Sequence, residues 1–187
     1  MDIFDDGADL VLEFSGGLDF TGLTAQGFGV IATTNPQAEI LASVSGSPFQ
    51  SSRVLSGVGP TAFYIGDITG STFASANSST DGLSFTRSGD TFGFNVVDGL
   101  GGQITLSSGY VAGSALSGSV VFQNASIEGQ NLIEGTHVFT LPNDIITVNI
   151  GDVATVPLPA AAPLLLGGII GLILLGRRRR APSDWRQ

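Results

Sequence analysis

The sequence has no cysteine, no lysine and a single histidine among its 187 residues. Without cysteine, neither disulfide bonds nor thiolate metal sites are available. Basic residues are scarce before the C-terminal region: only Arg53 and Arg87 precede residue 154, against fifteen acidic residues, so residues 1–153 carry a formal charge of −13. A nucleic-acid-binding protein needs a basic face, and this composition therefore excludes a nucleic-acid partner. Such acidity also helps to keep a domain soluble.

Catalytic motifs are missing as well. His137 is the only histidine, so a His-rich metal centre cannot be built, and a Ser-His-Asp triad would have to use this residue. No G-x-S-x-G elbow precedes a helix, and no lysine follows a glycine-rich stretch as in a phosphate loop. We therefore predict no enzymatic activity. Paired carboxylates of the glycosidase type stay open, because their separation in space decides their chemistry.

The sequence contains 27 glycines and 12 phenylalanines. Short apolar stretches alternate with turn-forming residues along the sequence. Many short strands separated by turns are typical of an all-β domain. We predict an antiparallel β-sandwich over residues 1–153, either jelly-roll-like or Ig-like. The predicted strands are Asp9–Phe14, Gly27–Thr33, Glu39–Val44, Thr61–Ile65, Leu83–Arg87, Thr91–Val97, Gln103–Ser107, Val120–Phe122, Val138–Leu141 and Ile145–Ile150.

Three predictions concern the connections between strands. Residues 68–81 are rich in Gly, Ser, Thr and Asn, which predicts a mobile surface loop. The compact turn Ser88-Gly89-Asp90 predicts a hairpin between its flanking strands, and this hairpin would continue into a three-strand meander ending at Ser107. The sequence Pro142-Asn143-Asp144 predicts the turn between the last two strands.

Acidic turns suggest an alternative function. Asp81, Asp90 and Asp98 lie at consecutive turns, and carboxylates at turns can bind Ca²⁺. The sequence has no D-x-D-x-D-G loop, and aspartate also forms turns without binding a metal, so we expect no cofactor. A carbohydrate- or Ca²⁺-binding, lectin-like module at the cell envelope remains the alternative function, and a self-assembling structural protein is a further one.

The C-terminal region has three parts in a fixed order. A proline-containing motif precedes an apolar segment, residues 160–176, whose length of about 25 Å as a helix is near the minimum for crossing a membrane. Arg177, Arg178, Arg179 and Arg180 then stop the segment, since each costs about 2.5–3.5 kcal/mol to insert. The positive-inside rule places these arginines and the short tail 182–187 in the cytoplasm, and residues 1–153 outside it.

The motif itself is Val156-Pro157-Leu158-Pro159-Ala160. Together with the apolar segment and the arginine block, it resembles the VPLPA-type variant of the bacterial PEP-CTERM sorting domain, over residues 154–181. Leu158 stands where this family often has an acid, which fits the VPLPA subtype. A second, weaker resemblance to proteins of this group lies in Ser108–Gly118 and in the segment around Gly135.

The resemblance implies an exported cell-surface or extracellular-matrix protein. Its partners would be the membrane, an exosortase-type processing protease that cuts near the motif, and extracellular polysaccharide. It would reside in the bacterial inner membrane, with a single C-terminal transmembrane helix, while in transit to the cell surface or the extracellular space. The acidic start, with Asp2, Asp5 and Asp6, lacks the basic and apolar regions of a signal peptide, so we expect one upstream of Met1.

Overall fold

The computed structural model describes residues 1–31, 37–43, 51–97 and 100–151. All strands found in these ranges belong to one compact unit, Met1–Val153, and no helix occurs among them. They form two seven-stranded sheets, as expected for an all-β sandwich. Sheet A contains, in spatial order, β7 (Thr69–Gly70), β13 (Gly135–Thr140), β14 (Ile145–Ile150), β1 (Asp2–Asp6), β2 (Asp9–Gly17), β12 (Ala115–Phe122) and β9 (Phe85–Gly89). Sheet B contains β3 (Thr24–Ile31), β6 (Gly59–Gly66), β11 (Gly101–Ser107), β10 (Phe92–Val97), β5 (Ser51–Gly57), β4 (Gln37–Ser43) and β8 (Ser78–Ser79).

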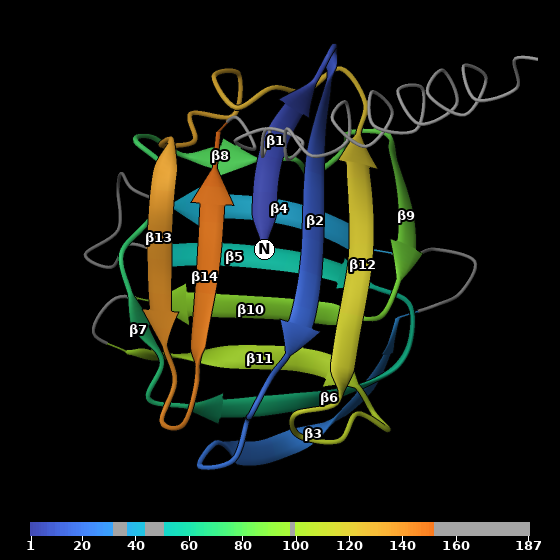
Figure 1. Ribbon diagram of the computed structural model, residues 1–187, viewed down its shortest axis with the longest axis vertical. Coiled ribbons are helices and arrows are strands. Elements are labelled where there is room, and N and C mark those ends of the chain that lie inside the picture. Colours follow the sequence, from blue (N-terminus) through green and yellow to red (C-terminus); the bar gives the residue numbers. More distant parts are fainter. Residues whose placement is uncertain (32–36, 44–50, 98–99, 152–187) are drawn as a thin grey trace, which may run out of the picture. The chain divides into compact units, whose positions relative to one another are not determined.

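The strands of the two sheets run crosswise: those of sheet A are upright in Figure 1, whereas those of sheet B lie behind them and run across the view. Ig-like sandwiches keep the two strand directions within about 30° of each other. The crosswise arrangement therefore differs from the Ig-like version of the prediction. It belongs with the orthogonal type of sheet packing, in which strands pass between sheets at corners.

One neighbouring pair departs from the predicted antiparallel order. β1 lies between β14 and β2, and it pairs in parallel with β14, with Asp2 opposite Asn149 and Ile3 opposite Ile150. The backbone N–H of Gly151 donates to Ile3 O at 3.0 Å and extends this pairing. The sequence prediction missed β1, because its acidic residues outnumber the apolar ones that mark a strand.

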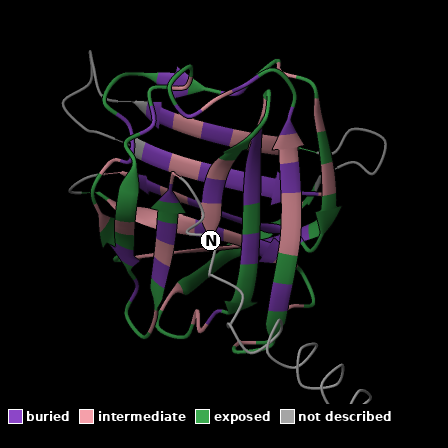
Figure 2. Ribbon diagram, turned by 45° about the horizontal axis from the view of Figure 1, so that its top comes forward, coloured by how far each residue is buried: buried purple, intermediate pink, exposed green. Residues whose placement is uncertain are grey.

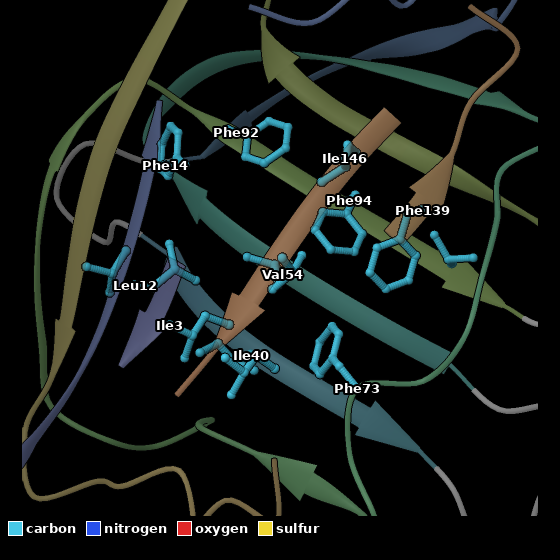
Figure 3. Packing of buried hydrophobic residues seen from close by; sticks show 14 of the residues in the cluster. Ile3, Leu12, Phe14, Ile40, Val54, Phe73, Phe92, Phe94, Phe139 and Ile146 are labelled. Atoms are coloured by element: carbon cyan, nitrogen blue, oxygen red, sulfur yellow. The ribbon is translucent and has the colours of Figure 1, made fainter. Parts of the chain in front are cut away.

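The core lies between the two sheets and contains much of the phenylalanine (Figure 3). Buried residues alternate with more exposed ones along β14, whereas β2 has three buried residues in succession, Leu10, Val11 and Leu12; Figure 2 colours the strands by this burial. Phe94 of sheet B meets Phe139 of sheet A with ring centroids 4.8 Å apart, and Phe14 meets Phe92 at 5.3 Å. These aromatic contacts hold the crossed sheets together through burial and tilted ring packing.

The prediction of a surface loop over residues 68–81 is only partly right, because the largely irregular segment also carries buried anchors. Ile68, Phe73 and Ala74 are at most 1% exposed, and the segment contributes β7 and β8 to the sheet edges. The ring of Phe73 packs edge-on against Phe139, with centroids 6.2 Å apart. A few apolar anchors are therefore enough to fix a connection whose overall composition is polar.

The predicted meander is half right. β10 and β11 pair as expected, but β9 pairs with β12 in sheet A, so the chain changes sheets at Ser88-Gly89-Asp90. Arg87 stabilises this corner by donating to Gly89 O at 2.9 Å and to Asp90 O at 2.7 Å. Its Nε donates to Ser56 Oγ of β5 at 3.2 Å. Desolvation lowers the pKa of Arg87, and the charge of Asp90 opposes this shift.

The other sequence predictions agree with the structure to different degrees. The strand Ile145–Ile150 and the turn at residues 142–144 are confirmed. The strand predicted at Val120–Phe122 is longer, because β12 already begins at Ala115. β5 was not predicted, because its serines obscure the inward-facing Val54.

Candidate functional site

The sorting-signal residues lie outside the part of the chain that the structure describes. This holds for the motif at 156–160, the apolar segment 160–176 and the arginines 177–180. Within the described ranges, no helix has the length and apolar character needed to cross a membrane.

Of the three aspartates considered as weak metal-ligand candidates, Asp90 has a structural partner. Asp90 accepts the backbone N–H of Ser117 at 2.8 Å, which ties the β9–β10 corner to β12. Asp81 is exposed in the turn after β8, where its backbone N–H donates to Ser79 Oγ at 3.0 Å. Asp98 lies outside the described residues. Among the residues that are described, no three His, Asp or Glu side chains gather closely enough to hold a metal ion.

The acidic cluster near the N-terminus includes Asp5 and Asp9, and both of these residues accept hydrogen bonds. Asp5 accepts the backbone N–H of Ile127 at 2.9 Å, and Asp9 accepts that of Asn124 at 3.0 Å. These two bonds join the β1–β2 hairpin to the segment between β12 and β13. Because each carboxylate replaces a backbone acceptor, the cluster is explained by the fold.

His137 has a structural position on β13. Its Nε2 lies 2.8 Å from the carbonyl oxygen of Ile133, and its ring approaches the edge of Phe73, with centroids 6.4 Å apart. This nitrogen therefore contacts a backbone carbonyl, whereas a catalytic triad would require a serine or a carboxylate there.

A hollow of about 150 Å³ opens on the outer face of sheet B, the face turned away from sheet A, and it is the strongest candidate site. Cross-strand register brings its residues together. Asn95 of β10 lies opposite both Gln103 of β11 and Arg53 of β5, and Thr105 lies opposite Phe63 of β6. The hollow is lined by Gln37, Arg53, Val54, Leu55, Phe63, Phe94, Asn95, Gln103 and Thr105.

Gly93 lets a neighbouring side chain pack closely onto the sheet beside the hollow. It faces outward on β10, between Leu55 and Thr105. A Cβ at this position would approach Leu55 Cδ1 and Val54 O to 2.8 Å, so a side chain here would have to displace its neighbours. The side chain of Leu55, which is part of the lining, therefore takes the space next to Gly93.

The lining combines neutral polar groups, one aromatic ring and a neutralised charge. Asn95, Gln103 and Thr105 are partly buried, and within the described chain their side chains form no hydrogen bond. The guanidinium of Arg53 forms an ion pair with Glu39 at 3.3 Å. A few placed polar groups beside an apolar surface are the usual composition of a ligand-binding site.

A second hollow, of about 90 Å³, lies near the N-terminus. Phe14, Leu18 and Phe92 line it together with the side chains of Ser15 and Thr147 and with Met1, whose amino group donates to Thr147 O at 3.1 Å. It is smaller than the hollow on sheet B and its polar side chains are two short hydroxyl groups, so we regard it as a gap at the end of the core.

Comparison of the chain with family models, with curated proteins and with solved structures gives no match. The site is therefore interpreted from its own chemistry. Sequence analysis missed the hollow because its residues come from five strands that are spread from Gln37 to Thr105. The only local signal was outward-facing amides in the alternating β10 and β11 segments.

Proposed function

We propose that the protein is an exported bacterial cell-surface or extracellular-matrix protein whose C-terminal region is an exosortase-type sorting signal. The order of motif, apolar segment and arginine block in residues 154–181 supports this proposal. Residues 1–153 form the exported domain, which has no catalytic activity. Residues 160–176 form the single membrane helix, and residues 182–187 remain in the cytoplasm.

The mechanism follows from the energetics of the three parts. The arginines 177–180 arrest export, because each guanidinium costs about 2.5–3.5 kcal/mol to bring into the hydrocarbon region. The apolar segment then holds the protein in the inner membrane. Pro157 and Pro159 lack a backbone N–H and disfavour a regular helix, so they keep the motif accessible to the protease at the outer surface.

The charge of the domain supports a role for the tail in localisation. With a formal charge of −13, residues 1–153 are repelled by anionic lipid headgroups. Such a domain does not adhere to a bacterial membrane by itself, and cleavage near the motif would release it. A jelly-roll-like classification of this domain stays a prediction.

The test is the C-terminal mass of the protein recovered from the envelope and the medium of its host. We expect the wild type to lose its tail near residues 156–160, and the double variant Pro157→Ala and Pro159→Ala to retain it in the membrane fraction. Pro163→Ala, inside the apolar segment, is the matched control and should be processed normally. Retention of residues 177–187 in all recovered wild-type protein would overturn the sorting mechanism.

The lectin-like alternative contains two proposals, Ca²⁺ binding and carbohydrate binding. Ca²⁺ binding was suggested by the acidic turns, but the carboxylate of Asp90 in one of these turns already accepts a backbone hydrogen bond. A rise in melting temperature on adding Ca²⁺ would revive it. Its carbohydrate-binding form is favoured by a different observation, the hollow on sheet B.

A further inference from the structure

We propose that the hollow on the outer face of sheet B binds an uncharged segment of a polysaccharide chain. Phe63 would pack against one face of a sugar ring, and Asn95 and Gln103 would bond its hydroxyl groups. The strands β5, β10, β11 and β6 that carry the site lie side by side in the middle of sheet B (Figure 1). The site is therefore built on a rigid surface.

The two amides form the polar part of the site. Asn95 and Gln103 are direct partners across β10 and β11, so their side chains project from the same face at adjacent positions. Each amide offers one acceptor oxygen and two N–H donors. Neighbouring hydroxyls of a sugar also donate and accept, so a pair of free amides matches them. Partly buried polar groups without a protein partner gain most from such a ligand.

Phe63 forms the apolar part. It is half-buried on the outer face, next to Thr105, whereas most phenylalanines of the described domain lie in the core. Its ring lies against Gly29 of β3, where a Cβ would approach Phe63 Cε2 to 2.8 Å. Gly29 therefore allows the ring to lie close to the sheet, and an aromatic ring on an open surface can pack against the apolar C–H face of a sugar.

The charge pattern selects an uncharged ligand. The only charged side chain of the lining is Arg53, and Glu39 neutralises it at 3.3 Å. A polyanion would meet the overall charge of −13 on residues 1–153 without a free cation in the hollow to attract it. Acidic polysaccharides, phosphorylated lipids and nucleic acids are therefore poor ligands for this surface.

The shape selects a chain segment. The hollow of about 150 Å³ is smaller than the roughly 300–1,000 Å³ of pockets that enclose a small molecule. Because the hollow lies on the face of a sheet, the middle of a long polymer can lie across it, and no chain end has to fit inside. We expect weak binding at each site, with a Kd of roughly 0.1–10 mM, because few groups contact each sugar.

The experiment uses the purified full chain in a polyoxyethylene detergent, whose headgroup contains no sugar. Electrophoretic retardation is measured in native gels that contain hydroxyethylcellulose, xyloglucan, galactomannan or dextran, with alginate as the acidic comparison. We expect retardation by at least one neutral polymer and none by alginate. Because this measurement does not involve processing, its failure leaves the sorting proposal intact, and the reverse also holds.

Four variants locate the site. Phe63→Ala and Gln103→Ala should each weaken binding at least about fivefold, a loss that corresponds to one aromatic or hydrogen-bond contact. Phe63→Trp should preserve binding if the ring is the platform, which a purely structural role would not predict. Gln123→Ala removes an exposed amide outside the hollow and should bind normally. No retardation by any neutral polymer, or equal loss in Gln123→Ala, overturns the proposal.

Discussion

The corner at Gly89 allows a direct test of the fold, because the sequence and the structure assign this glycine different surroundings. In a hairpin turn a side chain added at Gly89 would meet open space. In the structure it lies opposite Gly118 at a change of sheet, with φ of +82°. A Cβ on Gly89 would lie 2.3 Å from Ser117 O and 2.5 Å from Gly118 Cα, and both of these are backbone atoms.

Gly89→Ala should therefore cost free energy in two ways. A left-handed backbone conformation costs an L-residue about 1–2 kcal/mol. Forcing an extra carbon against fixed backbone adds about 1–3 kcal/mol, so the total loss of unfolding free energy is about 2–5 kcal/mol. Gly7→Ala is the matched control: Gly7 has φ of +69°, but nothing lies within 4 Å of its added Cβ, so only the first cost applies.

The assay is urea unfolding of the full chain followed by far-UV circular dichroism. Fluorescence is unsuitable because the only tryptophan, Trp185, lies in the C-terminal region. Both variants should keep the wild-type m-value, which shows that the same surface unfolds. If Gly89→Ala and Gly7→Ala lose the same stability within about 0.5 kcal/mol, Gly89 has open surroundings and the corner between the sheets is refuted.

Three further predictions concern the core, the corner and pH. Phe94→Ala should lower the unfolding free energy by about 3–5 kcal/mol in the same assay, because its ring is 2% exposed between the sheets. Arg87→Ala should cost about 1–3 kcal/mol through its three lost hydrogen bonds, whereas Arg53→Ala, which breaks one partly exposed ion pair, should cost at most about 1 kcal/mol. Hydrogen bonds from Thr21, first from its hydroxyl and then from its N–H, lower the pKa of Asp19. The stability they provide is present above the unfolded carboxyl pKa and is lost as pH falls below about 4, so Asp19→Asn should reduce the loss of melting temperature in acid.

The sequence predicted the fold class because alternation and turns are local signals. The strand Ile145–Ile150 has a polar residue beside each inward apolar one, and its boundaries are predicted correctly. β1 and β5 were missed for the opposite reason. Their polar residues reflect demands from other parts of the fold, such as Asp5 accepting the N–H of Ile127 and Ser56 accepting from Arg87.

Pairing between strands was less predictable than the strands themselves. The strand predicted at Leu83–Arg87 exists, with bounds Phe85–Gly89, but the short turn that follows it can close a hairpin or lead to the other sheet. The choice depends on partners distant in sequence: Asp90 bonds Ser117, and Gly118 leaves room for Gly89. The residues of the turn itself reveal neither of these contacts, so the turn sequence alone favoured a hairpin.

The candidate site was missed for the same reason as the pairing of β9 with β12, because it too depends on strands that are distant in sequence. Asn95 and Gln103 are close because β10 and β11 form a predicted hairpin, whereas Phe63 joins them through the long-range pairing of β6 with β11. Gly93, which leaves the space that the Leu55 side chain takes beside the hollow, has no special φ that would distinguish it from other glycines in the sequence. The acidic turns attracted attention as candidate ligands because charge is visible in a sequence, yet the carboxylate of Asp90 is used to close the fold. A neutral binding surface on a sheet is created by register, so it becomes visible only when the strands are placed side by side.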